Sequence, residues 1–72
     1  GPAAFPNPFS DVIHLEGIDI LRVALYDMQG RDLYELVRTD DPTVLHTKGL
    51  APGMYILVVT DARGGHVFKM SR

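Results

Sequence analysis

The sequence contains no cysteine, so no disulfide bond can stabilise this fold. It has no apolar run near the roughly 20 residues that a membrane-spanning helix needs, and no charged-then-apolar signal peptide opens it. The net charge is −2 at pH 7, so the chain has no excess of positive charge to attract nucleic acid or an acidic membrane. The sequence therefore argues against a disulfide scaffold, a nucleic-acid-binding protein and direct membrane insertion.

The chain has 72 residues, which is enough for one small domain. A domain of this size buries only about 60% of its unfolded surface, so its stability is expected to be marginal. Residues Gly1-Pro2 resemble the remnant that a processing protease leaves when an expression tag is removed. We therefore expect a single domain over residues 3–72 that is a piece of a longer protein.

The longest run of strand-forming residues, Met54–Val59, follows a turn rich in proline and glycine. Pro52 fixes its own φ angle and Gly53 tolerates a positive φ angle, so the chain can reverse direction there. Six consecutive apolar residues predict a strand that is covered on both faces or crosses the middle of a sheet. The hydroxyl group of Tyr55 is expected to return to the upstream backbone near Leu50, as in the tyrosine corner of immunoglobulin-like sandwiches.

Other segments also have the composition of strands, and short polar turns separate them. The spacing Asp-x-x-Gly occurs at both Asp27–Gly30 and Asp61–Gly64 and predicts two tight hairpins, the first a type I turn closed by a bulge. Strands at intervals of roughly ten residues, with no helical period, predict an all-β fold. We expect a small immunoglobulin-like antiparallel β-sandwich of six to seven strands. Besides the central strand, the predicted strands are Val12–Glu16, Leu21–Asp27, Arg31–Arg38, Thr43–Thr47 and His66–Met70.

The segment before the first of these strands contains two prolines in three residues. Pro6 and Pro8 lack backbone donors and fix φ, so the chain around Asn7 is predicted to be extended and to flank a sheet edge. We expect the neighbouring rings of Phe5 and Phe9 to anchor this segment to the core.

No arrangement of side chains predicts catalysis. The histidines lie on separate predicted strands, with no close pair and no cysteine, so neither a metal site nor a cofactor site is expected. Asp40 and Asp41 belong to a predicted loop, Thr39–Pro42, where aspartate normally caps turns. No nucleophile elbow and no phosphate loop followed by a helix is present. We do not expect an enzyme. The histidines are His14, His46 and His66.

Four short patterns, taken in their order along the chain, resemble a known family. Each alone is a generic turn or strand pattern, but the ordered set is similar to the C-terminal sorting domain carried by cargo proteins of the type IX secretion system of Bacteroidetes. The similarity extends from Phe5 to Arg72. The patterns are Pro6–Phe9, Leu25–Arg31, Leu50–Tyr55 and Phe68–Met70.

This resemblance implies a domain without catalytic activity that addresses its cargo to an outer-membrane translocon. The cargo would pass through the periplasm and finish at the outer membrane and cell surface, or be secreted. The implied partners are the type IX translocon, a shuttle barrel protein of the outer membrane and a sortase-like cysteine protease that removes the domain. The cleavage point is expected at or before Ala3 to Phe5.

The family pattern also assigns roles to single positions. Members often end in two separated lysines, and here Arg72 stands in the last basic place. A barrel or adaptor could add a strand to the last strand, or contact Lys69 and Arg72. Alternatively, these two charges only keep a sheet edge in solution. The expected sorting signal is Phe68, Lys69, Met70, Ser71 and Arg72, and the expected structural motif is Pro6, Asn7, Pro8, Gly30, Leu50, Gly53, Tyr55 and Gly64.

Two other functions are compatible with a small sandwich. A fibronectin-like or carbohydrate-binding accessory module of an extracellular enzyme would need two or three exposed aromatic rings on one flat face. A spacer or dimerisation domain would associate weakly through unprotected sheet edges.

Overall fold

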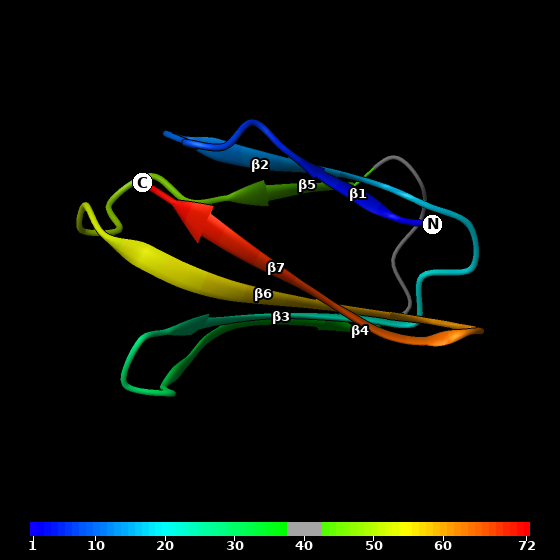
Figure 1. Ribbon diagram of the computed structural model, residues 1–72. Coiled ribbons are helices and arrows are strands. Elements are labelled where there is room, and N and C mark those ends of the chain that lie inside the picture. The colour runs from blue at the N-terminus through cyan, green and yellow to red at the C-terminus, as the bar shows by residue number, and fades with distance from the viewer. Residues whose placement is uncertain (38–42) are drawn as a thin grey trace.

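The computed structural model describes residues 1–37 and 43–72, which form seven β-strands and no helix. These strands form two antiparallel sheets that face each other (Figure 1). The smaller sheet has the order β1-β2-β5 and the larger sheet the order β4-β3-β6-β7. The prediction of a small all-β sandwich is confirmed. The strands are β1 (Ala3–Phe5), β2 (Val12–Glu16), β3 (Arg22–Asp27), β4 (Asp32–Val37), β5 (Thr43–His46), β6 (Met54–Asp61) and β7 (Gly64–Ser71).

Six of the seven observed strands match predicted ones, but β1 was not predicted as a strand. Among the predicted strands the differences fall at the ends, and the largest is in β7, which starts at Gly64 where the sequence predicts a strand from His66. The two glycines at its start lack side chains that favour a strand, but the tight turn pairs Gly64 with Asp61 and continues the ladder. The predicted loop Thr39–Pro42, with Asp40 and Asp41, lies outside the described residues.

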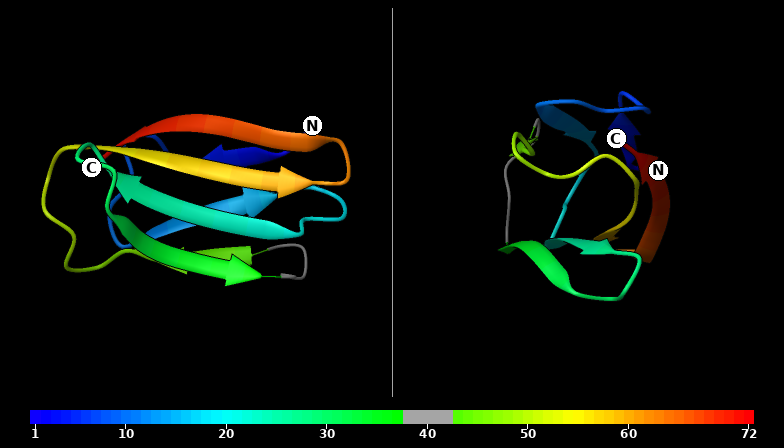
Figure 2. Two further views of the ribbon diagram at one scale, coloured as in Figure 1. Left: turned by 90° about the horizontal axis from the view of Figure 1, so that it is seen from below. Right: turned by 90° about the vertical axis from the view of Figure 1, so that its left-hand side faces the viewer.

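β6 lies in the interior of the larger sheet, between β3 and β7, as Figure 2 shows. Its side chains alternate, so that Tyr55, Leu57 and Val59 are buried while Ile56 and Val58 are half-buried. Successive side chains of a strand point to opposite faces, and only one face of this sheet meets the other sheet. β6 therefore crosses the middle of the sheet but is covered on one face only.

The core fills the space between the two sheets. Phe9 belongs to it, with 3% of its surface exposed, as the sequence predicts. The prediction for Phe5 is wrong, because its ring is 41% exposed and stacks on His14 with ring centroids 5.5 Å apart. Alternation along β1 turns Ala4 toward the core and Phe5 outward. The buried core residues are Phe9, Ile13, Leu15, Ile20, Val23, Leu25, Leu45, Tyr55, Leu57, Val59 and Met70.

The β3–β4 hairpin has the predicted type of turn. The Gly30 N–H group donates to the Asp27 carbonyl oxygen over 3.1 Å, and the Asp27 N–H group donates to the Arg31 carbonyl oxygen over 3.1 Å. Gly30 has a φ angle of 84°, which an L-residue with a β-carbon rarely adopts. The strand pairing shifts by one residue just beyond the turn, as a bulge requires.

The Pro52-Gly53 turn is tied to β6 through Tyr55. The Tyr55 hydroxyl group donates to the carbonyl oxygen of Ala51 over 2.5 Å, which is the upstream return that the sequence predicts. The same ring packs edge-on against Phe9, with centroids 5.8 Å apart. Tyr55 therefore connects the turn, the core and the proline-rich segment.

Replacing Tyr55 with phenylalanine removes this hydrogen bond and leaves the ring in the core. We expect Tyr55→Phe to lower the free energy of unfolding by about 1 kcal/mol, the usual net value of such a bond. Urea unfolding of the two proteins measures the difference. Tyr34→Phe is the matched control, because the described residues offer its half-buried side chain no hydroxyl partner. Equal effects of the two substitutions would contradict the role of Tyr55.

Candidate functional site

The predicted sorting signal occupies the second half of β7 and the residue that follows. β7 starts in the larger sheet and crosses obliquely toward the smaller one (Figure 1). Met70 is 1% exposed and belongs to the core, and Phe68 packs partly against the same core. The Lys69 side chain is exposed on the outer face, and Ser71 is half-buried. Thus the predicted signal contains residues that hold the strand and residues that a partner can reach.

Asn7 covers the outer edge of β7. Its Nδ2 donates to the Lys69 carbonyl oxygen over 2.9 Å, and the Ser71 N–H group donates to its Oδ1 over 2.9 Å. A carboxamide presents a donor and an acceptor side by side, as a peptide unit does, so this side chain pairs with β7 like a neighbouring strand. The Phe9 N–H group extends the pairing to the Ser71 carbonyl oxygen over 2.8 Å.

Pro6 and Pro8 stand on either side of Asn7, and both of their preceding peptide bonds are cis. Neither proline has an N–H group to offer β7, and the Asn7 side chain supplies the donor that the backbone lacks. The predicted contact of this segment with a sheet edge is therefore present, and a side chain mediates part of it.

Arg72 forms hydrogen bonds through its backbone to Gly53 and through its side chain to Ser10. Its N–H group donates to the Gly53 carbonyl oxygen over 2.8 Å and its carbonyl oxygen accepts from the Gly53 N–H group over 3.0 Å. Its Nε donates to the Ser10 carbonyl oxygen over 3.0 Å, and its Nη2 lies 3.6 Å from Oδ1 of Asp11. Only 20% of the side chain is exposed. The guanidinium group of Arg72 thus joins the end of the chain to the segment after Phe9.

Thr47 is a structural residue that the sequence analysis missed. It is 1% exposed, and its hydroxyl group donates to the Ser10 carbonyl oxygen over 2.9 Å. Its N–H group donates to the Asp11 carbonyl oxygen over 2.8 Å. The Ser10 carbonyl oxygen therefore accepts from both Thr47 and Arg72. The alternation of β5 would have revealed this burial, because Thr47 stands two residues after the buried Leu45.

The residues of the predicted structural motif are only partly brought together. Gly53 lies beside Arg72 and has a φ angle of 148°. Leu50 packs partly against the core and donates its N–H group to the Thr47 carbonyl oxygen over 3.2 Å. Gly30 lies in the β3–β4 turn and Gly64 at the start of β7, each with a positive φ angle, so both shape hairpins away from the strand end.

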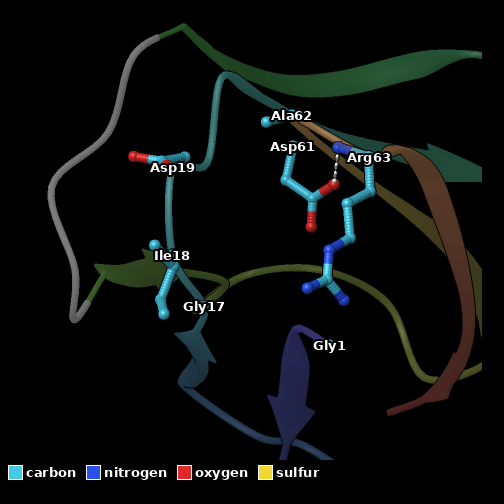
Figure 3. Close-up of a pocket in the computed structure, with 7 residues that line it drawn as sticks. All are labelled: Gly1, Gly17, Ile18, Asp19, Asp61, Ala62 and Arg63. Carbon is cyan, nitrogen blue, oxygen red and sulfur yellow. Dashed lines mark hydrogen bonds between the residues drawn. The ribbon is translucent and has the colours of Figure 1, made fainter.

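A hollow of about 240 Å³ lies at the other end of the sandwich, lined by residues 17–19 and 61–63 and by Gly1 (Figure 3). The Arg63 N–H group donates to Oδ1 of Asp61 over 2.8 Å, and Nε2 of His66 lies 3.0 Å from Oδ2. The bond from Arg63, and then the imidazole of His66, lower the pKa of the Asp61 carboxyl group. The Asp61 carboxylate thus serves the β6–β7 turn itself.

The remaining candidate groups do not converge. His14 and His46 lie on the smaller sheet and His66 on the larger one. Within residues 1–37 and 43–72, no three histidine or carboxylate side chains are placed to hold a metal ion. Phe5 is exposed, and the other aromatic side chains are buried or half-buried. The described chain therefore offers no flat face of several exposed rings.

These features define a small β-sandwich in which the last residues are tied to the segments that lead into both sheets. The sequence matches the family described as "Secretion system C-terminal sorting domain" over residues 3–71, and the chain belongs to this family. The resemblance seen in the sequence is confirmed. Comparison with curated proteins and with solved structures gave no significant match.

Membership of this family has direct consequences for function. The domain is a C-terminal sorting signal of type IX secretion, a class that is not itself catalytic. It implies interaction with the type IX machinery and export of the cargo to the cell surface or into the medium. No helix in the described part of the chain is long and apolar enough to cross a membrane.

Asn7→Ala removes the two hydrogen bonds that cover the edge of β7 at Lys69 and Ser71. We expect the free energy of unfolding to fall by about 1–2 kcal/mol, because each bond contributes roughly 0.5–1.5 kcal/mol. Hydrogen exchange measured by NMR should quicken at the Ser71 amide, which Asn7 covers. Gln29→Ala, at an exposed amide side chain in the β3–β4 turn, is the control. Unchanged exchange at Ser71 would show that Asn7 does not protect the edge.

Proposed function

We propose that the type IX outer-membrane translocon and its shuttle barrel protein recognise the folded outer surface of β7, centred on Lys69. The cargo reaches them from the periplasm with the sandwich already folded. A sortase-like cysteine protease then removes the domain on the cell surface. The domain itself carries out no reaction and serves as a targeting signal.

The fixed end of β7 is the observation that supports this proposal. Asn7 and Phe9 hold Ser71 from one side, and Gly53 holds Arg72 from the other. Lys69 projects from this fixed strand as an exposed charge. A partner that binds a pre-organised surface loses less conformational entropy than one that must first order a tail. Arg72 contributes through the shape that it maintains, since its guanidinium group already contacts Ser10 and Asp11.

The pairing of β1 supports a cleavage point before Ala3. Residues Ala3–Phe5 are paired with residues 14–16 of β2. A protease needs an accessible extended peptide, and cutting inside β1 would require this strand to leave its sheet. Cleavage on the N-terminal side of Ala3 leaves every strand of the sandwich in place.

Fusion of residues 3–72 to a passenger protein tests the proposal in a bacterium that has the type IX system. The passenger carries its own signal peptide, and the same passenger without the domain is the control. We expect surface or secreted passenger only with the domain, released with a C-terminus that precedes Ala3, as mass spectrometry would show. A fused passenger that stays in the periplasm while the domain is folded would refute the proposed function.

Reversing the charge of Lys69 tests the recognition surface in the same assay. Lys69→Glu should slow export about fivefold, the factor expected when roughly 1 kcal/mol is lost at the rim of an interface. Lys48→Glu makes the same change in net charge at an exposed turn position and should export like the unchanged domain. Both variants are first checked for unchanged thermal unfolding. Equal export of the two variants would rule out Lys69 as a contact.

A further inference from the structure

One edge of β7 faces β6, and the outer edge is covered in its second half only. Gly53 and Arg72 form a reciprocally hydrogen-bonded pair, and such pairs alternate along an antiparallel ladder. The register of β6 with β7 therefore directs the polar backbone groups of even-numbered β7 residues toward β6. The odd-numbered residues direct theirs outward. Asn7 and Phe9 cover the outward groups of Ser71 and the carbonyl oxygen of Lys69.

The first half of the same edge is uncovered. The N–H and C=O groups of Gly65 and Val67, and the N–H group of Lys69, have no outward partner among residues 1–37 and 43–72. Among the described strands β7 pairs only with β6 and ends the larger sheet, and the face beside this edge is exposed, with Val67 exposed by 66%. Seen from below, β7 is the outermost strand on its side of the larger sheet (Figure 2). An extended chain can therefore lie beside it.

The side chains along this open edge include one cation near each end and an apolar residue at the centre. Lys69 stands at one end and Arg63, in the turn before β7, at the other, and both are exposed. β7 itself contains no acidic residue. Val67 lies opposite Val58 of β6, which adds apolar surface on the same outer face. The Asp61 carboxylate near Arg63 is already engaged by the Arg63 N–H group and by His66.

We propose that the open half of β7, from Gly65 to Lys69, receives an extended segment of a partner protein as a fifth strand of the larger sheet. The matching segment carries an apolar side chain for Val67, with acidic side chains on both sides to meet Lys69 and Arg63. This inference rests on the proposed function, in which the partner belongs to the secretion machinery.

A second copy of this domain fits the edge less well. Antiparallel pairing of two β7 strands through Gly65 and Val67 would place Lys69 opposite Arg63 of the other copy, and like charges directly opposite each other are unfavourable. If one β7 strand were shifted by two residues relative to the other, the pairing would need the Lys69 carbonyl oxygen as an acceptor. That oxygen already accepts from Asn7. An acidic segment meets neither obstacle.

Val67→Pro is the critical variant. Because the Val67 N–H group faces outward, proline removes a donor for the added strand without removing a bond between β6 and β7. Val67→Ala is the matched control, since it shortens the side chain and keeps the donor. Thermal unfolding of both variants confirms that the domain remains folded.

Binding is measured with synthetic heptapeptides of alternating threonine and valine, capped at both termini. One peptide has glutamate at each end and the other has lysine. The glutamate peptide should shift the NMR signals of the Gly65, Val67 and Lys69 amides, and the lysine peptide should bind at least about threefold more weakly. Val67→Pro should abolish the binding and Val67→Ala should retain it. Equal binding of both peptides, binding that survives Val67→Pro, or a dimer in sedimentation that Val67→Pro dissolves would overturn the proposal.

The same variants in the passenger fusion separate this inference from the proposed function. Export of the unchanged domain with loss of export in Val67→Pro supports both. Export of a folded Val67→Pro domain at the normal rate would overturn the role of the open edge while the sorting function stands. Failure of the unchanged domain to direct export would refute the sorting function, and the peptide experiment would then decide whether the edge binds a strand.

Discussion

The pairing of the Asn7–Ser10 segment with the end of β7 is the constraint on which the rest of this structure depends. β7 belongs to the larger sheet, while the segment continues into β2 of the smaller sheet. The bonds from Asn7 and Phe9 to β7 therefore tie the two sheets together along one side. The burial of Phe9 and Met70 on either side of these bonds keeps the segment and the strand in register.

A chain with no cysteine must fix its ends by noncovalent means. Here the Ser10 carbonyl oxygen accepts hydrogen bonds from the Thr47 hydroxyl group and from the Arg72 guanidinium group. These bonds join β5, the segment before β2 and the chain end at one point, much as a disulfide would join two distant segments. A buried polar group is costly when it lacks a partner, so such a cluster favours one arrangement of the chain.

The sequence predicted the fold well because the signals for strands and turns are local. Alternation along Val12–Glu16 and the Asp-x-x-Gly spacing at Asp27–Gly30 depend only on neighbours in the chain. The contacts that build the candidate site are long-range. Nothing local in the sequence shows that the Asn7 carboxamide pairs with Ser71, 64 residues away, or that Arg72 reaches Ser10. Phe5 was misplaced for a related reason, since the pairing partner of β1 decides which of its faces meets the core.

The outer edge of β7 is thus covered in one half and open in the other, and we propose a different task for each half. β6 pairs with β7 along its whole length and Asn7 covers the end of the strand, so a partner at the open half would find backbone groups already aligned. Strand addition to a mobile tail would first have to order it, at a cost of about 1–2 kcal/mol of backbone entropy per residue. Over the few residues from Gly65 to Lys69 this cost is comparable to the binding free energy of a weak complex. In the proposed binding of a strand, the pairing of Asn7 with the end of β7 adds to the order that β6 already gives this strand.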